Sequence, residues 1–104
     1  MMQFDEYIAG CYGVNEAILV EVLRKLIRRN EERNENHYEG KYWVRITLPE
    51  LRKEVPFWDT KEKVGRILLS LCNQGVVEKA NFNNMIGQML DQTNWYTLTD
   101  KADL

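Results

Sequence analysis

The order of local signals along this chain predicts an α+β fold of the winged helix-turn-helix type. A strand-like run at 42–46 is followed by a short helix signal and then by the turn at 55–60. A longer helix signal at 60–74 comes next, and two further strand signals lie at 76–80 and 94–98. Because the last two strands are joined by a loop, they can pair as an antiparallel hairpin whose loop forms the wing.

Length and composition indicate one globular domain that spans residues 1–104. The hydrophobic share is 44% and the aromatic share is 11%, which is typical of a folded protein. No apolar run approaches the ~20 residues of a membrane span, and the acidic N-terminus differs from the basic start of a signal peptide. We therefore expect a cytoplasmic protein.

Residue types that perform catalysis or bind metals are sparse. His37 is the single histidine and lies in a charged segment, while Cys11 and Cys72 are far apart in the sequence. Neither a Ser/His/Asp set nor a phosphate-binding glycine loop nor a zinc-ligand cluster is present. We therefore expect no enzymatic activity, metal, cofactor or small-molecule substrate, and we interpret Cys72 as a small buried side chain.

Apolar spacing predicts two helices before the first strand. The first belongs to an N-terminal extension, residues 1–12, and the second runs from about 16 to 34. Asn15 is a candidate N-cap for the second helix because its side-chain oxygen can accept from free backbone N–H groups. Residues 34–40 are predicted to be a loop, and residues 99–104 a tail.

The helix-turn-helix segment has clear start and stop signals. Thr47 can cap a helix at 48–54, which Pro56 ends because it forces the preceding residue out of helical angles. Asp59 or Thr60 can cap the helix at 60–74. We expect Phe57 and Trp58 to fill the corner between these helices. Gly75 should end the second one in the left-handed conformation.

The apolar positions of these elements define a core. We expect the buried side chains to include Ile18, Val22, Leu26, Trp43, Leu51, Ile67, Leu71 and Trp95.

The charge distribution favours nucleic-acid contact by the helix at 60–74. Residues 41–75 carry seven basic and four acidic groups, whereas the segments on either side are acidic. In helix-turn-helix proteins the second helix enters the major groove of DNA. The polar residues best placed to contact duplex DNA are Lys61, Lys63, Arg66, Ser70 and Asn73, together with Arg45 on the preceding strand.

The wing at 81–92 points to a different partner, because it contains neither Lys nor Arg and cannot neutralise DNA phosphates. Met85, Ile86, Met89 and Leu90 recur at one-turn spacing, as on one apolar face of a helical turn. These side chains either fold back onto the core or form a protein-contact surface together with the exposed Leu69, since Met-rich apolar patches suit interfaces.

Several motifs resemble one known family, the winged-helix domain at the start of replication proteins from phages and plasmids of low-GC Gram-positive bacteria. The matching segments occur in the family's order at Gly13–Ala17, Gly40–Val44, Pro56–Trp58, Gln74–Val77, Asn81–Asn83 and Thr93–Tyr96. The resemblance implies a winged helix and a DNA-binding role in replication or transcription control of a mobile element. The family's wing is basic, and this one is not.

Two functions follow from these observations. The first is binding of duplex DNA through the helix at 60–74. The alternative is a protein-interaction module that uses the apolar wing, such as a small phage-encoded inhibitor or an oligomerising adaptor, with a homodimer as one form of that contact.

Overall fold

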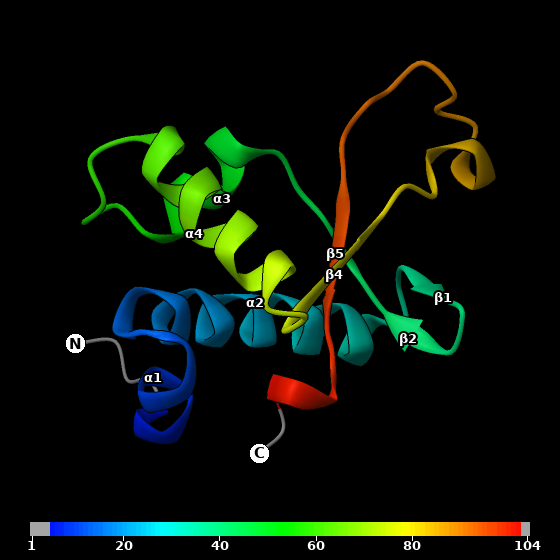
Figure 1. Cartoon of the computed structure of the whole chain (residues 1–104). Helices are drawn as coiled ribbons and strands as arrows, with labels where there is room; N and C mark the ends of the chain where they lie inside the picture. The colour runs from blue at the N-terminus through cyan, green and yellow to red at the C-terminus, as the bar shows by residue number, and fades with distance from the viewer. Residues whose placement is uncertain (1–4, 103–104) are drawn as a thin grey trace.

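The computed structural model describes residues 5–102 and has an α+β fold, with four α-helices and two small antiparallel sheets in those residues (Figure 1). The elements in chain order are α1 (Glu6–Tyr12), α2 (Val14–Arg33), β1 (His37–Tyr38), β2 (Lys41–Tyr42), β3 (Val44–Arg45), α3 (Leu48–Glu54), α4 (Lys61–Asn73), β4 (Val77–Ala80), the 3₁₀ helix η1 (Asn83–Ile86), β5 (Trp95–Leu98) and the 3₁₀ helix η2 (Asp100–Ala102).

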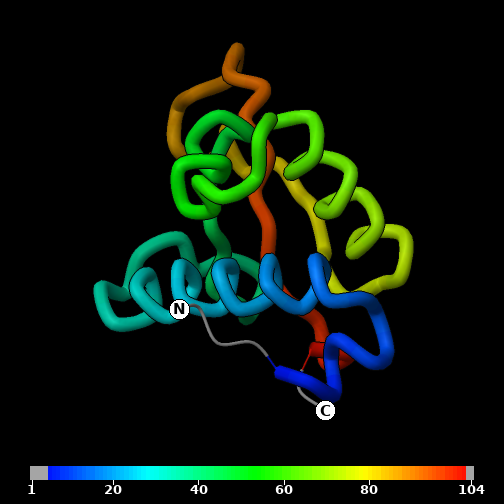
Figure 2. The backbone as a smooth tube through the Cα atoms, turned by 90° about the vertical axis from the view of Figure 1, so that its left-hand side faces the viewer, coloured from blue at the N-terminus to red at the C-terminus, as the bar shows by residue number. Residues whose placement is uncertain are grey.

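Helix α2 is the scaffold on which the other elements pack. Figures 1 and 2 show α3 and α4 on one side of α2, and α1 and η2 on the other. Its buried residues are Ala17, Leu19, Val20, Val22, Leu23 and Leu26. The helix is thus the core-forming element that the apolar spacing predicts.

The prediction that Asn15 caps α2 is wrong. The helix begins at Val14, and the N-cap position is occupied by Gly13, which has no side chain to donate or accept. Gly13 has φ = 114°, and a Cβ at this position would lie 2.4 Å from Oε2 of Glu16. Only glycine adopts this backbone conformation without strain, so the sharp turn between α1 and α2 sets the start of the helix.

The segment that contains α3 and α4 follows its sequence signals closely. The hydroxyl of Thr47 accepts from the backbone N–H of Glu50, whose carboxylate accepts from the N–H of Thr47, so a complete capping box starts α3. The hydroxyl of Thr60 caps α4 by accepting from the N–H of Lys63 at 3.2 Å. Gly75 follows α4 with φ = 75°, the predicted left-handed stop.

The larger sheet has the order β3-β5-β4, with all neighbours antiparallel. Tyr96 on β5 pairs with Val44 on one side and with Lys79 on the other. The single strand predicted at 42–46 is divided between two sheets, because the N–H of Trp43 donates to the carbonyl of Asn36 instead. The predicted loop at 34–40 consequently contains β1, which pairs with β2.

The core forms largely as expected. Of the eight predicted core residues, all except Ile18 are buried, and Ile18 packs at the edge of the core with a partly exposed side chain. Cys72 is likewise half-buried rather than fully buried. A second cluster of Trp43, Phe82 and Trp95 lies apart from the main core and supports the end of the hairpin.

Phe57 and Trp58, the two aromatic residues between α3 and α4, differ in their burial. The prediction that both belong to the core is therefore wrong for Phe57. Trp58 is 4% exposed, whereas Phe57 is 53% exposed. The two rings meet edge to face with centroids 5.5 Å apart. Trp58 fills the corner between α3 and α4, so its neighbour in the turn is directed to the surface.

Among residues 5–102, no helix combines the length and the apolar composition that crossing a lipid bilayer requires.

Candidate nucleic-acid interface

The solvent-facing stripe of α4 is short and has no net charge. It consists of the exposed residues Glu62, Arg66, Leu69 and Asn73, which follow one another at helical spacing. The opposite face of α4 is buried through Val64, Ile67, Leu68 and Leu71. Arg66, Leu69 and Asn73 therefore point outward as predicted, with an acidic side chain in the same stripe.

Gly65 lets α4 approach α3 closely. A Cβ at Gly65 would lie 3.2 Å from Cδ1 of Leu48, which is tighter than an ordinary contact. This close packing fixes the position of the exposed stripe relative to the α3–α4 turn.

The other polar residues predicted to contact DNA on α4 lie away from the centre of the stripe. Lys61 is exposed in the first turn. The ammonium of Lys63 lies 5.9 Å from the centroid of the Trp58 ring, in cation–π geometry. The hydroxyl of Ser70 accepts a hydrogen bond from Nε2 of Gln74 at 3.0 Å. The structure thus places Arg66 and Asn73 on one exposed face, two turns apart, and leaves Lys61, Lys63 and Ser70 at its margins.

Arg45, the remaining predicted DNA contact, is bound to the β4–β5 loop, residues 81–94. Its Nε donates to Oδ1 of Asn83 at 2.9 Å, and its Nη2 forms an ion pair with the carboxylate of Asp91. The guanidinium of Arg45 thus joins β3 to both arms of this loop.

Asn83 is the centre of the network that holds the β4–β5 loop. Its side chain is 1% exposed. Its Oδ1 accepts from Nε of Arg45 and from Nε1 of Trp95, both at 2.9 Å. Its Nδ2 donates to the carbonyls of Asp91 at 2.9 Å and Thr93 at 2.8 Å. The amide is therefore fully hydrogen-bonded and clamps the outgoing arm of the loop to the returning arm.

Asp91 secures the returning arm. Its Oδ1 accepts from the backbone N–H of Thr93 at 2.7 Å and from the hydroxyl of Thr93 at 2.5 Å. These hydrogen bonds, together with Arg45, lower the pKa of the Asp91 carboxyl below its ordinary value. Asp91 is therefore held in its charged form.

Beyond this clamp, the loop tip, residues 84–90, is apolar and exposed. The exposed fractions are 69% for Met85, 40% for Ile86, 73% for Met89 and 95% for Leu90. The 3₁₀ helix η1 extends from Asn83 into the tip as far as Ile86, and Gly87 follows it with φ = 76°. The alternative that these four side chains fold back onto the core is wrong, and Figure 1 shows the loop projecting beyond the helices.

Sequence reasoning missed the clamp, although it noted the segment Asn81–Asn83. An asparagine between two loop residues ordinarily indicates a turn. Its burial depends on Arg45 and Trp95, which are distant in the sequence and reach it only after β3 and β5 have paired.

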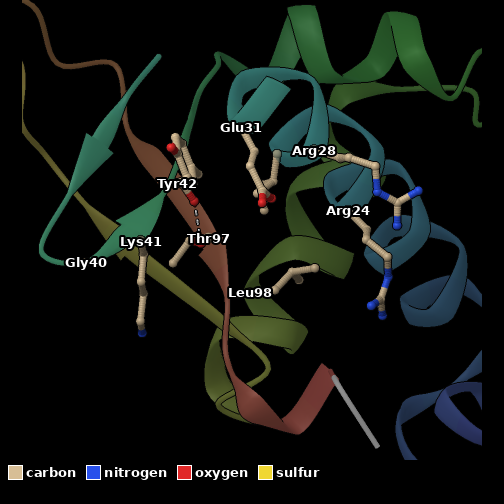
Figure 3. A pocket seen from close by; sticks show the side chains of 9 residues that line it. Arg24, Arg28, Glu31, Gly40, Lys41, Tyr42, Thr97 and Leu98 are labelled. Carbon is tan, nitrogen blue, oxygen red and sulfur yellow. Dashed lines mark hydrogen bonds between the residues drawn. The ribbon is translucent and has the colours of Figure 1, made fainter. Parts of the chain in front are cut away.

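A separate open groove, of about 480 Å³, lies between α2 and the strands β2 and β5 (Figure 3). Arg24 and Arg28 extend from α2 on one side, and Lys41 from β2 on the other. Nη2 of Arg24 donates to the carbonyl of Ala102 at 2.8 Å, and Nζ of Lys41 pairs with Glu78 at 3.0 Å. These contacts give Arg24 and Lys41 structural roles.

Comparison of the chain with protein-family models, with curated proteins and with solved structures finds no match.

Proposed function

We propose that this protein is a winged helix-turn-helix domain that binds duplex DNA through α4. The observation that carries the proposal is the exposed stripe of α4, on which Arg66 and Asn73 stand seven residues apart. The order β3, α3, α4 and the hairpin β4–β5, with β5 between β3 and β4, supports the same assignment.

The chemistry of these two side chains suits the major groove. Arginine donates to O6 and N7 of guanine, and asparagine pairs with N6 and N7 of adenine. Lys61 and the other cations near α4 would contact phosphates. Because Glu62 lies in the same stripe, we expect moderate affinity with a shallow salt dependence.

A titration of duplex DNA at two salt concentrations tests this function. Arg66→Ala should weaken binding at least tenfold and, if Arg66 contacts a phosphate, reduce the salt slope by about one unit. Lys63 is less suitable for this test, because its substitution would also remove the contact with Trp58.

The matched control is Arg29→Ala, which removes an exposed cation from α2. If Arg66→Ala and Arg29→Ala weaken binding equally, the protein attracts DNA only through its exposed cations in general and not through α4. An absence of binding to duplex DNA at low salt would refute the proposal.

The biological setting that fits this function is control of replication or transcription in a phage or plasmid. Its support is the set of motifs between Gly13 and Tyr96 that resembles replication proteins of such elements.

The exposed loop tip favours a second candidate function, contact with a protein. Four large apolar side chains in water are unfavourable by about 25 cal/mol for each Å² that a partner could cover. The clamp at Asn83 and Arg45 holds together the two arms that carry the tip, which lowers the entropy that the arms would lose on binding.

Ile86→Lys combined with Leu90→Lys tests this second function. We expect the double variant to lose its partner and keep its melting temperature, because both side chains are exposed. Loss of DNA binding in the same variant would instead place the tip at the DNA interface.

A further inference from the structure

Leu69 is an apolar side chain in the middle of the polar stripe of α4. Its exposed fraction is 59%, and among residues 61–73, all of which the structure describes, it is the one large apolar side chain left in solvent. Its neighbours along the stripe are polar, with Arg66 one turn before it and Asn73 one turn after it. The apolar surface of the stripe is therefore a single side chain, which is too small to form a protein-contact patch.

We propose that Leu69 contacts the C5-methyl group of a thymine, and that α4 therefore recognises duplex sites with a thymine between the bases that Arg66 and Asn73 contact. This inference rests on the proposed binding of duplex DNA through α4. It goes further by naming a base that the bound site must contain and the side chain that selects it.

The chemistry of the major groove selects thymine. Guanine, adenine and cytosine present hydrogen-bond acceptors and donors on their groove edges, whereas thymine adds an apolar methyl group. A leucine against one of the other bases would remove those polar groups from water without replacing their hydrogen bonds. Leu69 thus favours thymine by apolar contact and disfavours the other bases by desolvation.

The geometry of the helix places Leu69 inside the DNA contact rather than at its edge. An α-helix rises about 1.5 Å per residue, so Leu69 lies about 4.5 Å along the axis from Arg66 and about 6 Å from Asn73. At about 100° per residue, the three side chains project within an arc of about 60°. The span from Arg66 to Asn73 equals about three base-pair steps. If both polar side chains reach base edges, Leu69 faces a base pair between them.

Selection from a library of duplexes with a randomised central segment tests the assignment. The wild-type protein should enrich a motif with a fixed thymine. Leu69→Ala should lose the preference at that position and keep the rest of the motif, whereas the matched control Asn73→Ala should lose the preference at a different position. An enriched motif without a thymine, or one that Leu69→Ala reproduces in full, would overturn the inference.

Removal of the methyl group from the DNA tests the contact without any change in the protein. Replacing the fixed thymine of the enriched duplex by uracil keeps the base pair and should weaken wild-type binding about fourfold, the effect of one buried methyl group. Leu69→Ala should bind the thymine and uracil duplexes equally. The control is the same replacement at a thymine outside the motif, which should leave the affinity unchanged. Equal affinity of the wild-type protein for the thymine and uracil duplexes would overturn the inference.

The variant Arg66→Ala separates this inference from the function on which it rests. If Arg66→Ala weakens binding but the replacement of thymine by uracil does not, α4 contacts DNA without the proposed methyl contact, and only the inference fails. If the wild-type protein enriches no duplex and binds none at low salt, the proposed function and the inference both fail.

Discussion

Arg45 and Asp91 form an ion pair that ties β3 to the end of the β4–β5 loop, across 46 positions of the sequence. The same guanidinium also donates to Asn83 at 2.9 Å on the outgoing arm. Arg45 therefore contacts both arms of the β4–β5 loop and helps to hold them together.

Asn83→Ala should destabilise the protein by about 1–3 kcal/mol. The substitution removes the acceptor for Nε1 of Trp95 and the donor to two carbonyls, and it leaves buried polar groups without partners. Urea unfolding measures the change. Asn84→Ala is the matched control, because Asn84 is exposed and should alter stability by less than about 0.5 kcal/mol. Equal stabilities of the two variants would show that the clamp is not needed for folding.

Asp91 should make the wild-type protein more sensitive to acid than Asp91→Asn. The pKa of Asp91 is lowered in the folded chain, chiefly by the hydroxyl and the N–H of Thr93. Its contribution is therefore present above the unfolded pKa of about 3.9 and is lost as the pH falls through the lower folded value.

Melting temperatures recorded between pH 7 and pH 2.5 check this prediction. The difference between wild type and Asp91→Asn should shrink at the acidic end of the range. A difference that stays constant with pH would mean that the charge of Asp91 does not stabilise the fold.

Leu71→Ala should cost about 2–5 kcal/mol, because Leu71 is fully buried in the main core. Leu69→Ala removes the same atoms from a neighbouring position of α4 that is 59% exposed. It should therefore change stability by about 0.5 kcal/mol or less. Chemical denaturation of both variants tests the assigned orientation of α4, which would be incorrect if the two costs were similar.

Thr47→Ala should cost about 0.5–2 kcal/mol through loss of the capping box of α3. Thr47→Ser keeps the hydroxyl and should retain most of the stability. Thermal unfolding distinguishes the variants, and an equal decrease in both would point to packing of the threonine methyl group instead.

The sequence by itself determined the elements whose signals are local. Thr47, Thr60 and Gly75 mark helix ends because their effects act within one turn of the backbone. The apolar periodicity of α2 and α4 likewise identified most of the core, since spacing along a helix fixes which face is buried. The same rule assigned Glu62, Arg66, Leu69 and Asn73 correctly to the exposed side of α4. It also placed Gly65 and Ser70 there, but both are only partly exposed and Gly65 packs against Leu48.

Tertiary structure decided the features that the local sequence signals left open. Gly13 rather than Asn15 starts α2, because the turn from α1 needs a positive φ. Trp58 takes the corner between α3 and α4, which leaves Phe57 at the surface.

The exposure of the apolar side chains in the β4–β5 loop was also determined by the tertiary structure. Its four apolar side chains were compatible with burial or exposure, because spacing alone does not say whether a core lies beneath them. Asn83 and Arg45 resolve the alternatives by clamping the arms of the loop away from the main core. That clamp exists only once β3, β4 and β5 have paired, and no local pattern in the sequence encodes it.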